Sequence, residues 1–244
     1  MRLYRPPAGS HKGENGRLFI LGGSRRYHGA PALSILAARR FVDLVYFYPA
    51  ERGPHLMQAV KSIPEVIVVD GYDLVGKADC VLFGVGMGEA HIIFRVPDAR
   101  RWKLVIDGDG LKRVKAHVPA GSILTPHEGE FRALFDMEGT AANVKRMAAK
   151  HRCVILKKGP VDIISDGKKV ARNAVHNPGM TKGGTGDVLS GLVAALACKN
   201  DSFTAAVAAA KINGMAGNIL MKRYGYNFCA SDLADTLALA ARRI

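Results

Sequence analysis

Short apolar runs of strand length alternate along the chain with stretches that have the periodicity of helices. Continuous apolar strands with crossover connections between them are typical of a parallel sheet that is buried on both faces. We therefore predict an α/β fold with a mostly parallel sheet that is covered by helices on both faces. The predicted strands comprise residues 18–21, 45–48, 66–69, 81–83, 104–106, 123–124 and 154–156.

The remaining pattern predicts a hairpin and several helices. The turn Asp166-Gly167 separates the runs 161–164 and 169–175, which predicts a β-hairpin at the edge of the sheet. The sequence contains no internal repeat, low-complexity tract or linker, and 244 residues suit one α/β domain. We therefore expect a single domain over residues 1–244. The predicted helices comprise residues 31–42, 127–135, 187–197, 203–222 and 232–243.

Composition excludes disordered and membrane-spanning classes of protein. Hydrophobic residues make up 48% of the chain and charged residues 23%, which is ordinary globular usage. No apolar run approaches the roughly 20 residues that span a bilayer, and the N-terminus lacks the apolar stretch of a signal peptide. We expect a cytoplasmic protein with no membrane partner.

The net charge of +14 attracts anions of any kind. The basic residues are dispersed, however, and the sequence contains no zinc-finger spacing, basic-region heptad or ribonucleoprotein motif. We therefore expect no nucleic-acid partner. The charge is explained either by a basic solvated surface or by the attraction of a small anionic substrate.

The four cysteines do not form a metal or disulfide pattern. Cys80, Cys153, Cys198 and Cys229 lie far apart, and no two of them make a Cys-x-x-Cys pair. Each stands among apolar neighbours, so we predict four buried, reduced thiols. The sequence assigns no metal ligand.

The strongest motif is the run of Gly183, Gly184, Thr185 and Gly186, directly before Asp187 and an apolar helix. Glycines let backbone amides converge without obstruction by side chains. The free amides of a first helical turn, together with the helix dipole, favour an anion at that point. The motif therefore predicts a phosphate site with an acid beside it, and the alternative is that Asp187 merely caps the helix.

Three further motifs stand where strands end. Gly84-x-Gly86 follows one strand, in an imperfect match to a dinucleotide-binding fingerprint that tight strand-to-helix turns explain almost as well. His127 follows the strand at 123–124, where a histidine is ordinarily a surface or capping residue. Lys158 ends the strand at 154–156 and could reach a phosphate there or remain a solvated turn residue. The carboxyl ends of parallel strands are the usual edge for ligand groups.

Taken together, these motifs resemble those of the nucleotide-dependent NAD(P)H-hydrate dehydratases, a family with a ribokinase-like fold. The resemblance covers nearly the whole chain, and its combination of motifs is more specific than Gly-Thr-Gly-Asp alone, which would indicate only the wider superfamily. The matching motifs are His11-Lys-Gly13, Gly22-Gly-Ser24, Tyr27-His-Gly-Ala-Pro31, Gly84-x-Gly86, Asp107-x-Asp109, Thr125-Pro-His-Glu-Gly-Glu130, Lys158-Gly159, Asn177-Pro-Gly-Met180 and Gly183-Gly-Thr-Gly-Asp187.

The resemblance implies repair of a damaged cofactor. The family removes water from the C6-hydrated form of NADH or NADPH, with ADP or ATP as co-substrate, and Mg²⁺ is expected to accompany the nucleotide. The resemblance also implies that the protein forms homo-oligomers, often tetramers. By position, the residues that contact the hydrated dinucleotide would be Ala30, Gly86, His127 and Asp187, with Asp187 as the general base. Those that hold the nucleotide would be Lys158, Gly159, Pro160, Val161, Asp162, Gly183, Gly184, Thr185 and Gly186.

Three positions depart from the family pattern. His176 and Lys182 stand where a glycine and a small or apolar residue are expected, at the rim of the nucleotide pocket. We expect the charge of Lys182 to strengthen nucleotide binding. Gly110 replaces the usual alanine after the second aspartate. We also expect no epimerase domain ahead of His11, although the family often carries one.

Other functions remain open at this point. A vitamin or sugar kinase of the same superfamily would use the same base and anion site but would leave the phosphate on its product. A non-catalytic nucleotide sensor would use Asp187 only as a cap. A dehydrogenase would be built on Gly84-x-Gly86.

Overall fold

The apolar runs form the strands of one sheet in the computed structural model, which describes residues 3–90 and 102–244. Most strands agree with the predicted bounds to within one or two residues. The strands are β1 (Arg17–Gly22), β2 (Leu44–Pro49), β3 (Val66–Val68), β4 (Cys80–Phe83), β5 (Lys103–Ile106), β6 (Ile123–Leu124), β7 (Val154–Lys157), β8 (Asp162–Ser165) and β9 (Val170–Asn173).

The order of strands in the sheet is β3-β2-β1-β4-β5-β6-β7-β8-β9. Every pair from β3 to β7 is parallel, whereas β8 pairs antiparallel with β7 and with β9. The hairpin of β8 and β9 therefore lies at one edge, as predicted. The mostly parallel α/β fold is confirmed.

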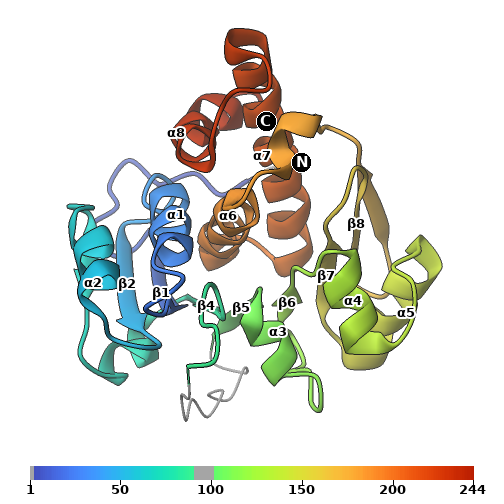
Figure 1. The fold of residues 1–244 in the computed structure, drawn as a ribbon, viewed down its shortest axis with the longest axis horizontal. Helices are drawn as coiled ribbons and strands as arrows, with labels where there is room; N and C mark the ends of the chain where they lie inside the picture. The colour runs from blue at the N-terminus through green and yellow to red at the C-terminus, as the bar shows by residue number, and fades with distance from the viewer. Residues whose placement is uncertain (1–2, 91–101) are drawn as a thin grey trace.

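Helices cover both faces of the sheet (Figure 1). Alternate residues of β1 show why its sequence is apolar throughout: Leu18 and Ile20 pack into the core on one face, and Phe19 packs into the core on the other. The helices are α1 (Gly29–Ala38), α2 (Pro54–Lys61), α3 (Asp109–Arg113), α4 (Glu128–Phe135), α5 (Ala141–His151), α6 (Thr185–Lys199), α7 (Ser202–Tyr224) and α8 (Ala230–Ala241), with short 3₁₀ helices η1 (Asp73–Lys77) and η2 (Pro178–Thr181).

The two faces carry different sets of helices. Residues of α1, α2, α6, α7 and α8 share the core of the first face, whereas residues of α3, α4 and α5 share the core of the second. Figure 1 shows α6 lying across the middle of the sheet, between α1 and α7. Helix α6 therefore presents its first turn near the ends of the central strands.

One sequence prediction about the core is wrong. Cys80, Cys153 and Cys198 are buried free thiols, but Cys229 is exposed. Cys229 stands directly before α8 in an extended conformation, and its backbone amide donates a hydrogen bond to Oδ2 of Asp232 at 2.8 Å. Its position at a helix start, on the outer side of the fold, explains the exposure that its apolar neighbours in sequence did not indicate.

Candidate functional site

The predicted site residues gather at the carboxyl ends of the central parallel strands. Gly84 follows β4, Asp107 follows β5, Thr125 follows β6 and Lys158 follows β7. Because these strands are parallel neighbours in the sheet, their ends meet at one edge. Ligands in open α/β sheets bind at this edge.

The glycines after β4 are required by close packing. Gly84 has a positive φ of 108°, and a side chain there would collide with the backbone of Asp107 and Gly110. A Cβ atom on Gly110 would lie 2.7 Å from the carbonyl oxygen of Phe83. A glycine at position 110, where the family pattern has alanine, therefore suits this contact.

Gly86 and Ala30, two of the predicted substrate residues, are brought together. Gly86 has a φ of 59°, and a Cβ atom there would lie 2.7 Å from the Cβ atom of Ala30 and 2.8 Å from the carbonyl oxygen of Tyr27. The start of α1 and the turn after β4 thus pack closely together, with Ala30 and Gly86 both half-buried. This packing accounts for the glycines without a dinucleotide-binding fingerprint.

Asp107 connects three strand ends through its buried carboxylate. Only 3% of this residue is exposed. Its Oδ1 accepts a hydrogen bond from Oγ1 of Thr125 at 2.8 Å and one from Nζ of Lys158 at 2.8 Å. Nζ of Lys158 also lies 3.8 Å from Oε2 of Glu130 on α4. The lysine therefore stands between two carboxylates.

The charges around Lys158 keep it cationic. Burial alone would lower the pKa of Lys158, but the carboxylates of Asp107 and Glu130 outweigh it and raise that pKa. A protonated lysine at the edge of the sheet suits contact with a phosphate. It is not the solvated turn lysine that the sequence left as an alternative.

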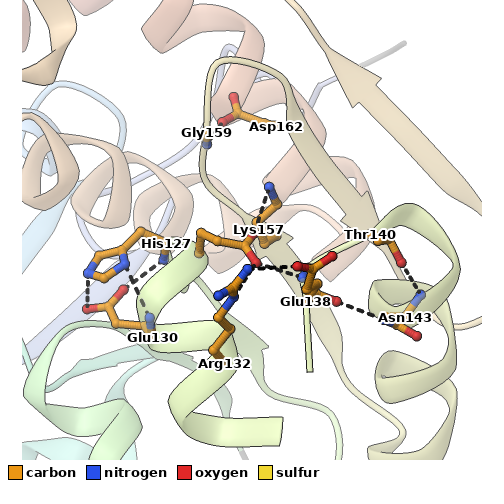
Figure 2. A network of polar contacts seen from close by, with 11 residues as sticks. His127, Glu130, Arg132, Glu138, Thr140, Asn143, Lys157, Gly159 and Asp162 are labelled. Carbon is orange, nitrogen blue, oxygen red and sulfur yellow. Dashed lines mark hydrogen bonds and ion pairs between the residues drawn. The ribbon is translucent and has the colours of Figure 1, made fainter. Parts of the chain in front are cut away.

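His127 does serve as a helix cap. Its Nδ1 accepts a hydrogen bond from the backbone amide of Glu130 at 3.2 Å, and Oε2 of Glu130 accepts one from the backbone amide of His127 at 2.8 Å. Figure 2 shows this reciprocal capping box at the start of α4. The cap fixes the ring, of which 60% stays exposed, so the histidine can still contact a ligand.

The neighbouring residue on β7 stabilises the outer side of the same region. Lys157 is buried, and its Nζ lies 3.4 Å from Oε2 of Glu128 at the first residue of α4. Oε1 of Glu128 accepts a hydrogen bond from the backbone amide of Gly139 at 2.9 Å. Lys157 therefore anchors the start of α4, whereas Lys158, the next residue, lies between Asp107 and Glu130.

The glycine run forms the start of α6. Gly184 precedes the helix with a φ of 91°, so Thr185, Gly186 and Asp187 make up its first turn. The amides of a first turn have no acceptor within the helix and can bind an anion. The Oγ of Ser34 donates a hydrogen bond to the carbonyl oxygen of Asp187 at 2.9 Å, which holds this turn against α1.

Asp187 is a residue of the first turn, and the capping position belongs to Gly184. The pKa of Asp187 is raised to about 7: burial is the largest cause, the charge of Asp107 adds to the rise, and the charge of Lys158 opposes it. A pKa near the working pH is the property of an efficient general base. The environment of Asp187 therefore fits proton transfer better than capping.

A cavity of about 240 Å³ lies beside this turn, between the 158–162 loop, η2, α6 and α7. Six of the predicted nucleotide residues line it, and so does His127. Val161, Gly183 and Gly184 do not line this cavity. The lining residues are His127, Lys158, Gly159, Pro160, Asp162, Val175, His176, Met180, Thr181, Thr185, Gly186, Leu189, Ala210, Asn213 and Gly214.

The 158–162 loop is held by Asp162. Its Oδ1 accepts a hydrogen bond from the backbone amide of Gly159 at 3.1 Å (Figure 2), and its Oδ2 accepts one from Nδ2 of Asn173 at 2.9 Å. Burial raises the pKa of Asp162, although both hydrogen bonds oppose that rise. Asp162 therefore fixes the loop that lines the cavity.

The two unusual residues at the rim have different positions. His176 lines the cavity. Nζ of Lys182 instead donates hydrogen bonds to the carbonyl oxygens of Tyr226 and Phe228, at 2.6 and 2.7 Å. The ammonium group of Lys182 thus joins the loop before α6 to the segment before α8. These hydrogen bonds give Lys182 a structural role, and the expected effect of its charge on nucleotide binding stays a prediction.

Two residues of this site carried little signal in the sequence. Asp107 belongs to a motif that carries the family resemblance, but the sequence assigned it no role, and its link to Lys158 depends on the sheet order. Asn213 lies within the alanine-rich helix α7, where nothing in the pattern marks a cavity.

Within the described ranges no cluster of three or more potential metal-ligating side chains is found. Nor is any described helix long and apolar enough to span a membrane.

Comparison with known proteins agrees with this geometry. Residues 18–239 match the model of the NAD(P)H-hydrate dehydratase family. The chain is 37% identical over 256 residues to an ADP-dependent (S)-NAD(P)H-hydrate dehydratase from Cenarchaeum symbiosum, an alignment that covers 93% of this chain and 89% of the relative. Other curated relatives are bifunctional NAD(P)H-hydrate repair enzymes, of whose length the chain spans about half.

Solved structures show the same fold. A ribokinase-like superfamily protein from Enterococcus faecalis superposes with a TM-score of 0.88 at 26% identity, covering 99% of this chain and 92% of that one. The ADP/ATP-dependent NAD(P)H-hydrate dehydratase of Bacillus subtilis, co-crystallised with ATP and Mg²⁺, has a TM-score of 0.84 at 25% identity, with 98% and 93% covered. The predicted ribokinase-like fold is confirmed, and the chain belongs to the NAD(P)H-hydrate dehydratase family.

Proposed function

We propose that the protein restores NADH or NADPH from the C6-hydrated form, with ADP as the phosphoryl donor. The observation that carries this proposal is the position of Asp187: a buried carboxylate in the first turn of α6, with its pKa raised to about 7, directly after Thr185 and Gly186, which line the cavity together with Lys158. Family membership and the similarity to an ADP-dependent relative support the choice of reaction and donor.

The first step activates the hydroxyl group of the substrate. Hydroxide is a poor leaving group, so the C6 oxygen is first phosphorylated. Asp187 accepts the hydroxyl proton as this oxygen attacks the terminal phosphorus of ADP, and AMP leaves. The backbone amides at the start of α6 and the ammonium group of Lys158 stabilise the charge on the transferred phosphoryl group.

The second step eliminates the phosphate. The lone pair of the ring nitrogen assists cleavage of the bond between C6 and oxygen, and inorganic phosphate departs with the bonding electrons. Loss of a proton from C5 then restores the double bond of the dihydropyridine. The net products are NADH or NADPH, AMP and phosphate, so the added water leaves as part of the phosphate.

The placement of the remaining residues supports their proposed roles. The closely packed Ala30 and Gly86, together with the exposed ring of His127, would contact the hydrated dinucleotide. The cavity residues of the 158–162 loop and of the first turn of α6 would hold the nucleotide. Val161, Gly183 and Gly184 would act through the backbone shape of these segments.

Mg²⁺ would be bound chiefly by the nucleotide itself. In nucleotide sites this ion ordinarily keeps several waters and is bound by one or two carboxylates and by phosphate oxygens, without a complete set of protein ligands. When bound, Mg²⁺ would neutralise charge on the phosphates.

Three wider expectations stay predictions. We infer that residues 1–244 form one domain, because the single sheet takes strands from β1 to β9. We also expect a cytoplasmic protein from the apolar pattern of the sequence, and the family resemblance implies a homo-oligomer, often a tetramer.

The proposal is tested by product analysis of the purified protein. It is incubated with hydrated NADH and either ADP or ATP, and the dihydronicotinamide absorbance, AMP, ADP and phosphate are followed together. We expect recovery of absorbance with equimolar phosphate, and AMP from ADP. Accumulation of a stable phosphorylated vitamin or sugar, without dehydratase activity, would instead identify a kinase of the same superfamily.

A further inference from the structure

Asn213 on α7 is a buried polar residue whose hydrogen bonds are incomplete. Only 6% of it is exposed, and its Oδ1 has no hydrogen-bond partner in the part of the chain that the structure describes. A buried polar atom without a partner is unfavourable, and native proteins contain few of them. Such an atom at a cavity wall suggests that a ligand completes its hydrogen bonds.

Two other buried asparagines nearby are fully bonded, which makes Asn213 distinctive. Nδ2 of Asn173 donates to Oδ2 of Asp162, and its Oδ1 accepts from the backbone amide of Val175. Oδ1 of Asn177 accepts from the backbone amide of Gly179, and its Nδ2 donates to Oδ1 of Asn218. The side-chain amides of Asn173 and Asn177 thus stabilise the local conformation of the chain. The incomplete bonding of Asn213 therefore does not reflect a general feature of this region.

The location of Asn213 indicates which part of a ligand it meets. It lines the 240 Å³ cavity from α7, whereas Thr185 and Gly186 line it from the first turn of α6. The first turn and Lys158 provide amides and positive charge for phosphates. Among the other lining residues, Leu189, Met180, Pro160 and Ala210 are apolar. A nucleotide with its phosphates at α6 would therefore place its flat base between apolar side chains, within reach of a neutral amide.

We propose that Asn213 is a specificity-determining residue that hydrogen-bonds the base of the nucleotide co-substrate, and that this base is adenine. The inference rests on the proposed function, because it takes the cavity to be the nucleotide site. A carboxamide offers one acceptor and one donor side by side. Adenine presents an amino donor next to the N7 acceptor, which matches an asparagine bidentately, whereas guanine presents two acceptors, O6 and N7, at the same edge.

The test compares Asn213→Ala with wild type by calorimetric titration with ADP, GDP and inorganic pyrophosphate. Wild type is expected to bind ADP more tightly than GDP. Asn213→Ala should bind ADP about tenfold more weakly, the loss that one or two hydrogen bonds to the base would cause, and should lose most of the ADP preference. Its affinity for pyrophosphate should stay within about twofold, because the phosphate contacts lie on α6 and Lys158.

Two further variants separate recognition from folding. Asn213→Leu retains volume without polar groups and should show the same loss of ADP preference, with a melting temperature at or above that of wild type. Asn218→Ala is the matched control, because Asn218 lies on the same helix, accepts a hydrogen bond from Asn177 and does not line the cavity. It should lower the melting temperature and leave the preference for ADP over GDP unchanged.

The outcomes distinguish this inference from the function on which it rests. An unchanged ratio of ADP to GDP affinity in both Asn213 variants would overturn the role of Asn213 and leave the proposed function standing. Equal loss of ADP, GDP and pyrophosphate binding with a lower melting temperature would also overturn it, since that result indicates a structural residue. Wild-type protein that binds neither ADP nor pyrophosphate would overturn the proposed function and this inference with it.

Discussion

Nζ of Lys158 lies 2.8 Å from Oδ1 of Asp107, beyond the ends of β7 and β5, which flank β6 in the sheet. The side chains of both residues are largely buried, with 17% and 5% exposed. Both charges also act on Asp187: Asp107 raises the pKa of the catalytic candidate, and Lys158 lowers it. Burial is the largest cause of the raised pKa of Asp187, and the pair adjusts that pKa through two opposing charges. A phosphate that recruits Lys158 would change the balance between them.

Asp187→Asn should give a folded protein that binds ADP but has almost no activity. The amide keeps the shape of the side chain but cannot accept the proton. Loss of a general base typically lowers the rate about 10²–10⁴-fold, whereas an acid in the first turn of a helix contributes only about 0.3–1 kcal/mol to stability. Steady-state rates, ADP titration and circular dichroism are the measurements. Turnover within a few-fold of wild type would mean that another group is the base.

The pH dependence of kcat/KM should show that Asp187 works as an anion. A carboxylate whose pKa is raised to about 7 loses its base form as the pH falls through that value. The rate of wild type should therefore fall below roughly neutral pH, in a region where an ordinary aspartate with a pKa near 3.9 would still be ionised. A rate that is flat from pH 5 to 8 would contradict this assignment.

Two substitutions should shift, in opposite directions, the pH at which kcat/KM falls on the acidic side; this part of the pH profile is called the acidic limb. Asp107→Asn removes a negative charge that raises the pKa of Asp187, so the limb should move to lower pH. Lys158→Met removes a positive charge that lowers it, so the limb should move to higher pH and ADP affinity should fall. Glu128→Gln is the control, because Glu128 pairs with Lys157 and is not among the charges that shift the pKa of Asp187. If the acidic limb lay at the same pH in all three variants, the Asp107–Lys158 ion pair would not influence the pKa of Asp187.

Much of the fold and of the site could be predicted because local sequence determines it. Apolar strands, glycine turns and the start of α6 are all read from short segments, and the parallel order brings the strand ends together. Long-range partners could not be predicted in the same way. Nothing in the sequence near Lys158 indicates that Asp107 is its partner, because the contact depends on β6 lying between β5 and β7 in the sheet.

Burial of single residues was also beyond the sequence pattern. Cys229 has apolar neighbours but is exposed at the start of α8, whereas Asn213 is polar but buried in α7. Each depends on how its helix packs against the rest of the fold. The sequence identifies the amphipathic or apolar character of a segment, and the packing of that segment decides the environment of each residue.

Gly86→Ala should impair the substrate side of the site without affecting ADP binding. The new Cβ atom would lie 2.7 Å from the Cβ atom of Ala30, at a φ of 59° that non-glycine residues rarely adopt. We expect a loss of about 1–2 kcal/mol of stability and a several-fold higher KM for hydrated NADH. Gly76→Ala is the control, because no atom lies within 4 Å of the added Cβ. Identical kinetics for the two variants would exclude Gly86 from the substrate surface.

Lys182→Ala should lower thermal stability more than it lowers ADP affinity. The ammonium group donates hydrogen bonds to the carbonyl oxygens of Tyr226 and Phe228 and lies 5.5 Å from the centre of the Phe228 ring. Loss of these charge-assisted contacts should destabilise the protein by roughly 1–3 kcal/mol. Through-space attraction of phosphates by Lys182 would instead make wild-type ADP affinity fall steeply with salt, and the variant would lack that dependence. Calorimetric titration with ADP at low and high salt, together with melting curves, distinguishes the structural role of Lys182 from attraction of the phosphates. A variant with unchanged melting temperature and weaker, salt-independent ADP binding would place Lys182 among the nucleotide contacts.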